Sequence, residues 1–163
     1  HIHDDRRIRH NFLLKAANDV LGLDIYDRNS NRKGEHYRFP AWDNTKINPS
    51  VSYPETADIY HNSLVSLNVN TVTDSPTMYS RRLVEIIACG GVAVTTPALS
   101  VDKLFSDYCY VVDSYEESVE LFSRLKHGPS KDDLERAKAG AEYVAEHHTW
   151  EHRLNEIRKI IGI

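Results

Sequence analysis

The sequence predicts an α/β protein with a Rossmann-like, doubly wound parallel sheet. Short apolar segments of strand length alternate with longer segments in which apolar residues recur at helical spacing, which is typical of parallel strands joined by helices on both faces. The 163 residues suffice for one domain with a sizeable core, and their 40% hydrophobic and 27% charged content is that of an ordinary globular protein. We therefore expect a single domain over residues 1–163.

The first third of the chain begins with a predicted helix and strand. Apolar residues recur at helical spacing over residues 4–21, and Gly22 is a stop signal for that helix. Residues 23–27 indicate a short strand, and residues 28–35 a polar loop rich in turn-forming residues. Residues 36–50 contain two prolines and are ambiguous between a loop and two short extended pieces. Because domains of this class usually begin with a strand, we expect a fragment that lacks its opening strand and anything upstream.

The middle third predicts two helices, with a strand between them. Pro54 lies in the first turn of a helix expected over residues 54–62. Residues 64–69 are apolar enough to form a strand buried on both faces. A loop rich in Asn, Thr, Asp and Ser occupies residues 70–76, and it leads into a helix expected over residues 77–89.

The last third completes the alternation and then turns helical. Gly90 and Gly91 end the preceding helix, and residues 92–96 indicate the next strand. A short helix is expected around residues 104–105, followed by a strand over residues 109–112. Three further helices complete the chain, at residues 115–126, 131–147 and 150–161, the last with Thr149 as its N-cap.

Composition excludes several classes of function. The net charge of -4 argues against a nucleic-acid partner, because phosphate backbones require a basic surface. No apolar segment reaches the roughly 20 residues that span a bilayer, and no signal peptide is evident, so we expect no transmembrane segment and a cytoplasmic location. Cys89 and Cys109 lack a Cys-x-x-Cys spacing and each lies beside an apolar run, which predicts two buried thiols. The nine histidines show no zinc-binding spacing, so we expect no metal.

The loop after residues 64–69 is the strongest candidate for a ligand site. In open α/β sheets, ligands bind beyond the carboxyl ends of the strands. This loop is long and hydroxyl-rich, and it leads directly into a helix that Ser75 or Thr77 could cap. The remaining amide groups of the first turn would then be open to a phosphate group. An ordinary capped helix without a ligand is the alternative.

Glu85 is the second indication of a site. It lies in a strongly apolar part of the helix expected over residues 77–89, where a carboxylate is unfavourable unless it is paired or hydrogen-bonded. Arg82 lies three positions earlier and can share its face. Two interpretations remain open. The pair is either a structural ion pair, or it binds a ligand, with Glu85 accepting hydrogen bonds from ribose hydroxyls and Arg82 facing a diphosphate.

The segment from Ser75 to Gly91 resembles the donor-site signature of the group 1 glycosyltransferases. It is most similar to the spore-maturation-type branch, in which an Arg-x-x-Glu sequence precedes an Ala-Cys-Gly-Gly turn. The similarity extends to residues 51–69, 110–117 and 148–154, and so covers most of the chain from residue 50 onward. The resemblance implies the C-terminal, nucleotide-sugar-binding half of a GT-B enzyme, in which the active site lies between two Rossmann-like domains.

The resemblance also implies roles for individual residues. Glu85 matches the family glutamate that binds the donor ribose, and Ser75, Pro76 and Thr77 match the loop beside the donor's phosphates and sugar. Many members carry a second glutamate, in contact with the transferred sugar, where this chain has Thr77. We expect a pocket formed by Thr71 to Arg82 and Glu85. The residues expected to bind the donor are Tyr53, which borders the base, and Ser75, Pro76, Thr77, Met78, Arg81, Arg82 and Glu85.

The sequence thus predicts a glycosyltransferase domain that binds a nucleotide-diphosphate sugar for transfer of the sugar to an acceptor. Arg81, Arg82 and the helix amides are the candidates for stabilising the leaving diphosphate. No cofactor beyond the donor is expected, and no general base is identified. The acceptor contacts and the base are expected on an N-terminal domain outside this chain. Two alternatives remain, namely a non-catalytic nucleotide-sugar-binding or coat-associated module, and a nucleotide-sugar epimerase.

Overall fold

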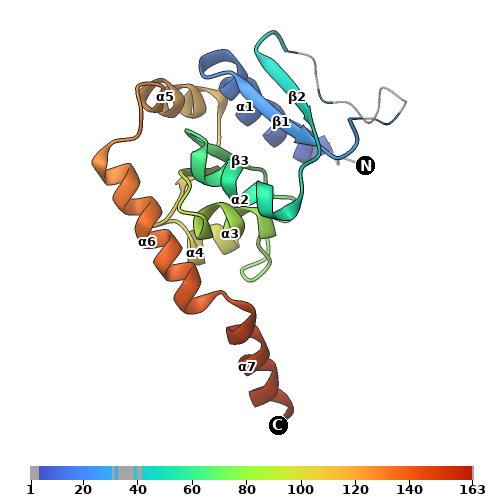
Figure 1. Cartoon of the computed structure of the whole chain (residues 1–163), viewed down its shortest axis with the longest axis vertical. Helices are drawn as coiled ribbons and strands as arrows, with labels where there is room; N and C mark the ends of the chain where they lie inside the picture. The colour runs from blue at the N-terminus through green and yellow to red at the C-terminus, as the bar shows by residue number, and fades with distance from the viewer. Residues whose placement is uncertain (1–3, 31, 33–38, 40–41, 163) are drawn as a thin grey trace.

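The computed structural model describes residues 4–30, 32, 39 and 42–162 of the chain. Strands and helices alternate through the first two thirds of the chain, and helices complete it (Figure 1). The strands are β1 (Leu23–Asp27), β2 (Thr45–Pro49), β3 (Ser66–Asn68), β4 (Ala93–Thr95) and β5 (Tyr110–Val111). The helices are α1 (Asp4–Val20), α2 (Tyr53–Asn62), α3 (Arg81–Ala88), α4 (Leu99–Leu104), α5 (Tyr115–Leu125), α6 (Lys131–His147) and α7 (Trp150–Ile161).

The predicted order of elements is confirmed. β1 has the predicted bounds, whereas β3, β4 and β5 are shorter than predicted. Within the ambiguous residues 36–50, β2 is one extended piece, while residues 36–38 and 40–41 lie outside the described part of the chain. Residues 31 and 33–35 of the predicted polar loop also lie outside it. The short helix expected around residues 104–105 begins earlier, at Leu99. Thr149 caps α7 as predicted, because its hydroxyl accepts a hydrogen bond from the His152 amide.

The start of α3 differs from the prediction of a helix beginning at Thr77. The helix begins at Arg81, four residues later, and Ser80 at the N-cap position is in the extended region. Ser75 Oγ accepts hydrogen bonds from the amides of Thr77 and Met78, so these amides belong to a side-chain turn. The prediction that Ser75 or Thr77 caps the helix is therefore wrong. The C-terminal end is as predicted, because Gly90 adopts a φ of +69° and stops the helix.

The strands form two small parallel sheets. β1 pairs with β2, and Leu23 lies opposite Thr45. In the second sheet β4 lies between β3 and β5, with Thr95 opposite both Asn68 and Val111. This mixed α/β arrangement with parallel strands fits a Rossmann-like fold.

The core lies on both faces of the β3–β4–β5 sheet. Adjacent residues of β4 point to opposite faces, and Ala93 packs with residues of α3, α4 and α6. Val94 packs with residues of α1 and α5. The largest fully buried side chains, Phe105 and Phe122, belong to one face each, and such burial stabilises by about 1.5–3 kcal/mol per side chain. The helices on each face therefore hold the carboxyl ends of the strands in place.

Close contacts between helices fix the position of α3. A Cβ atom at Gly140 of α6 would lie 2.8 Å from the Ile87 side chain, and one at Gly91 would lie 2.8 Å from the Tyr60 carbonyl oxygen at the end of α2. His61 of α2 also contacts the Cys89 carbonyl through its ring nitrogen, at 3.1 Å. Glycine is thus required where α3 meets α6 and where it meets α2.

The two cysteines are both free, and only one is buried as predicted. Cys109 is 2% exposed, and burial raises the pKa of its thiol to about 12. Cys89 is half-exposed, because it occupies the C-cap position at the surface end of α3. Burial in an apolar environment disfavours the thiolate, which makes Cys109 an inert packing residue.

The last helix, α7, extends away from the rest of the molecule (Figure 1). None of its described residues is buried. Across the described ranges, the structure contains no helix that is both long and apolar enough to cross a bilayer.

Candidate functional site

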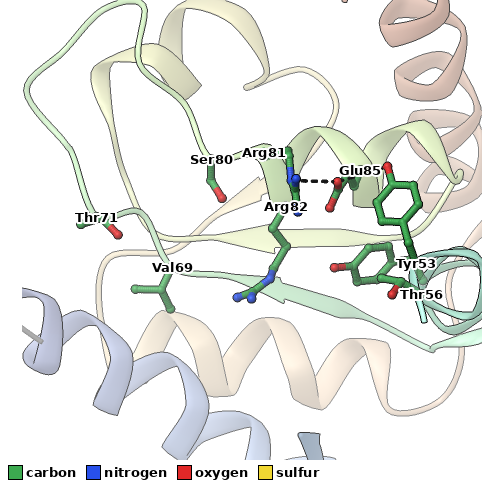
Figure 2. Close-up of a pocket in the computed structure, with 9 residues that line it drawn as sticks. Tyr53, Thr56, Val69, Thr71, Ser80, Arg81, Arg82 and Glu85 are labelled. Carbon is green, nitrogen blue, oxygen red and sulfur yellow. Dashed lines mark hydrogen bonds and ion pairs between the residues drawn. The ribbon is translucent and has the colours of Figure 1, made fainter. Parts of the chain in front are cut away.

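A cavity of about 340 Å³ opens where α2, the carboxyl end of β3 and the first turns of α3 meet (Figure 2). Its volume is within the range of about 300–1,000 Å³ found for small-molecule sites. Most of its lining side chains are polar or charged. The lining residues are Tyr53, Thr56 and Tyr60 from α2, Val69 and Thr71 after β3, and Ser80, Arg81, Arg82 and Glu85 from the start of α3.

Glu85 is the acidic side chain of this lining. Its side chain is 19% exposed, and Oε1 lies 3.1 Å from Nε of Arg81. The Tyr53 hydroxyl donates a hydrogen bond to the same oxygen, at 3.3 Å. The second oxygen, Oε2, accepts no hydrogen bond from any residue that the structure describes. One half of the carboxylate is therefore available to a hydrogen-bond donor in the cavity.

The ion pair of Glu85 is made by Arg81, whereas the sequence suggested Arg82. Residues four positions apart on a helix lie on the same face, and Arg81 takes this position relative to Glu85. In Figure 2 the Arg82 side chain extends away from the Arg81–Glu85 pair. Arg82 forms no ion pair with another residue in the described ranges. No carboxylate in the described ranges therefore neutralises its charge.

The charge of Arg82 affects the pKa of the neighbouring Tyr60 hydroxyl. Burial raises the pKa of its hydroxyl, and the Arg82 guanidinium acts in the opposite direction. Glu85 raises the same pKa as a smaller cause. The phenol, the guanidinium and the carboxylate therefore interact across one cavity.

The start of α3 adds backbone donors to this lining. The Ser80 hydroxyl accepts no hydrogen bond from the first helical turn. The amides of Leu83 and Val84 bond to the Ser80 carbonyl at 3.1 and 3.4 Å, so the first two helical amides have no acceptor among the residues that the structure describes. A helix start without a side-chain cap and with two adjacent arginines favours an anion.

The structure brings together four of the eight predicted donor-binding residues: Tyr53, Arg81, Arg82 and Glu85 all line the cavity. The other four, Ser75, Pro76, Thr77 and Met78, lie in the adjoining loop, outside the cavity lining. Thr71 and Ser80 belong to the predicted pocket range and line the cavity as well.

The sequence interpretation missed Thr56, Tyr60 and Val69. The first two had a usable signal, because Tyr53, Thr56 and Tyr60 follow one another at helical spacing. They therefore share one face of α2, and that face forms a wall of the cavity. Val69 had no comparable signal, because an apolar residue at a strand end is usually a packing residue.

A buried polar cluster lies at the carboxyl ends of β3 and β4. Asn68 Nδ2 donates to Thr95 Oγ1 at 2.9 Å and to Asn70 Oδ1 at 3.1 Å. All three side chains are at most 1% exposed. Asn68 Oδ1 has no partner within the described part of the chain. Val69 and Thr71, which line the cavity, alternate with these asparagines along the chain, so the cluster fixes the strand end from which the cavity wall begins.

Comparison with known proteins identifies one family. A model of the family described as glycosyl transferase-like matches residues 6–159, which include every residue that lines the cavity. A search of the curated proteins returns no match.

Proposed function

Because the chain belongs to the glycosyl transferase-like family, we propose that the cavity beside Glu85 binds the nucleotide-diphosphate sugar from which a glycosyl group is transferred. Membership of this family supports glycosyl transfer in general. We place the sugar donor in this cavity.

The free oxygen of Glu85 is the observation that carries this proposal. A ribose presents hydroxyl donors, and a carboxylate oxygen without a partner is the acceptor that matches them. Arg82 lies in the same lining and has no ion pair with another described residue, so it supplies a cation for the diphosphate. One cavity therefore offers complementary groups for both parts of a nucleotide.

The chemistry of the site follows from where charge develops. When the bond between the sugar and the diphosphate breaks, negative charge accumulates on the leaving diphosphate. Arg82, Arg81 and the amides at the start of α3 would stabilise that charge. We therefore propose a site that works without a metal ion. The residues that line the cavity include no carboxylate other than Glu85, so we place the base for the acceptor outside this domain.

We further propose that the domain is the C-terminal, doubly wound half of a two-domain GT-B enzyme. The parallel strands, with packed helices on both faces of the β3–β4–β5 sheet, support this architecture. The resemblance of residues 75–91 to group 1 enzymes of the spore-maturation type supports the same assignment. A second domain would then supply the acceptor contacts.

A non-catalytic nucleotide-sugar-binding module is the alternative that one observation favours. Thr77 stands where many group 1 members have a second glutamate, and it lies outside the cavity lining. A nucleotide-sugar epimerase is the other alternative. Incubation with a nucleotide sugar in the absence of an acceptor, followed by analysis of the products, would identify an epimerase.

Calorimetric titration with UDP, GDP, ADP and phosphate tests the donor site. We expect one nucleoside diphosphate to bind, and Glu85→Ala to weaken it at least tenfold, or about 1.4 kcal/mol. Glu135→Ala is the matched control, because Glu135 pairs with Lys131 in the same i, i+4 geometry on α6, outside the cavity lining. An affinity that Glu85→Ala leaves unchanged, or that both variants lower equally, would contradict the proposal.

A further inference from the structure

The loop between β3 and α3, residues 70–80, is attached to the segment that joins β4 to α4 and to the first turn of α4. Three hydrogen bonds connect them. The Asn70 amide donates to Thr96 Oγ1 at 3.0 Å, the Leu99 amide donates to the Thr73 carbonyl at 2.9 Å, and Ser100 Oγ donates to the Met78 carbonyl at 2.8 Å. Three residues, Thr96, Leu99 and Ser100, therefore hold loop 70–80 near its beginning, middle and end.

These attachments come from the interior of the protein. Thr95, Thr96 and Ser100 are all 0% exposed, and Asn70 is 1% exposed. The side-chain Nδ2 of Asn70 also donates to Thr95 Oγ1 at 3.0 Å and to the Thr96 carbonyl at 2.5 Å. Hydrogen bonds away from water are electrostatically stronger, and removing one partner leaves the other unsatisfied. The attachment points are therefore rigid.

The loop itself has little structure of its own. Pro76, Thr77 and Met78 are exposed, and the turn around them depends on Ser75 Oγ, at 3.4 and 3.1 Å from the Thr77 and Met78 amides. Ser100 holds the carbonyl of Met78, two residues before the N-cap Ser80. Tyr79, between them, packs edge-on against buried Phe105, with ring centroids 5.1 Å apart. The entry of the chain into α3 is thus set from the α4 side.

We infer that Ser100, which lies outside the cavity, is a positioning residue that fixes loop 70–80 and the start of α3 against the diphosphate end of the donor. This inference rests on the proposed function, because it takes the first turn of α3 as the diphosphate site. Ser100 acts through the Met78 carbonyl and is not among the residues that line the cavity. Its removal would loosen the chain segment that leads to Ser80 and Arg81 without removing any cavity-lining side chain.

Ser118 provides a matched control. It is also 0% exposed, and its hydroxyl also donates to a backbone carbonyl, that of Ser114, at 2.7 Å. Ser118 lies on α5, which packs with α1 and does not contribute to the cavity lining. Ser100→Ala and Ser118→Ala therefore remove the same chemical group from equally buried places.

Two readouts separate positioning from general stability. Hydrogen exchange at the Thr77 and Met78 amides should become at least tenfold faster in Ser100→Ala and stay unchanged in Ser118→Ala. In the same proteins, affinity for the nucleoside diphosphate that the wild type binds should fall at least fivefold in Ser100→Ala, while Ser118→Ala keeps wild-type affinity. Affinity for the corresponding nucleoside should not change in either variant.

The outcomes distinguish the two proposals. If the wild type binds and Glu85→Ala weakens binding, but Ser100→Ala changes neither exchange nor affinity, the role of Ser100 is overturned and the donor site stands. Equal effects of Ser100→Ala and Ser118→Ala also overturn it, because they reduce the role to stability. If the wild type binds no nucleoside diphosphate, the donor site fails, and the assignment of Ser100 to it fails with it, whatever the exchange rates show.

Discussion

Two arginine–carboxylate pairs in this molecule differ in how completely the carboxylate is satisfied. Asp133, at the start of α6, is 2% exposed and accepts hydrogen bonds from both terminal nitrogens of Arg124, at 2.7 and 3.0 Å. It also accepts bonds from the Ser130 amide and hydroxyl, at 2.7 and 2.9 Å, and from the Tyr110 hydroxyl. Glu85, in the cavity, has two partners that share one oxygen.

The difference indicates what each pair is for. The bonds to Asp133 engage both of its oxygens, and the hydrogen bonds from Arg124 hold the pKa of this carboxyl well below its usual range. A carboxylate satisfied in this way can connect β5, α5 and α6, but it has little left for a ligand. Glu85 retains an unused oxygen beside open space. The first arrangement stabilises the fold, and the second can bind.

The largest expected effect is on stability, from Asp133→Ala. The substitution leaves Arg124, Tyr110 and the Ser130 amide without their common acceptor, which should lower the free energy of unfolding by about 2–4 kcal/mol. Urea unfolding at pH 7 measures this loss. Asp132→Ala, at the exposed neighbouring position, is the control and should change stability by less than about 1 kcal/mol. Similar losses in the two variants would show that the Asp133 cluster is not a stabilising centre.

Acidification should erase the same contribution gradually. Because the pKa of Asp133 is lower in the folded protein than in the unfolded chain, its stabilising effect is fully present above the unfolded pKa of about 4 and is lost as the pH falls through the folded value. The stability advantage of the wild type over Asp133→Asn should therefore shrink below pH 4, by at most about 1.4 kcal/mol per pH unit. Urea unfolding of both proteins between pH 7 and pH 2.5 tests this. A difference that stays constant over that range would exclude Asp133 as the titrating group.

The part of the fold that the sequence could predict is the part that depends on local features. The order of strands and helices follows from apolar spacing and from stop signals such as Gly90, which are local features. The start of α3 could not be predicted in this way. It depends on Ser100 and Phe105, which lie at least 20 residues later in the chain and hold Met78 and Tyr79 outside the helix. Tertiary contacts override local propensity there.

For the site, the sequence could predict which residue types gather but not which of them pair. Glu85 was identifiable because a carboxylate in an apolar helix requires a partner. Both Arg81 and Arg82 lie within reach along the helix, and the choice between them depends on side-chain directions that the spacing leaves open. The wall made by Thr56 and Tyr60 required knowledge of how α2 packs beside α3, through the contact of Gly91 with the Tyr60 carbonyl.

The smallest expected effect on stability is that of Arg81→Ala, the counterpart of Arg124→Ala in the buried pair. Arg81 has an 84% exposed side chain, so its ion pair with Glu85 should contribute less than about 0.5 kcal/mol to the free energy of unfolding. Arg124→Ala removes the equivalent partner of buried Asp133 and should cost about 1–3 kcal/mol. Urea unfolding of the two variants side by side gives both values. Equal losses would mean that the Arg81–Glu85 pair is a structural ion pair like the other, and the free oxygen of Glu85 would then no longer support a ligand site. A small loss in Arg81→Ala beside a large one in Arg124→Ala would show that the fold does not depend on the Arg81–Glu85 ion pair, as we expect for a pair that lines a binding site.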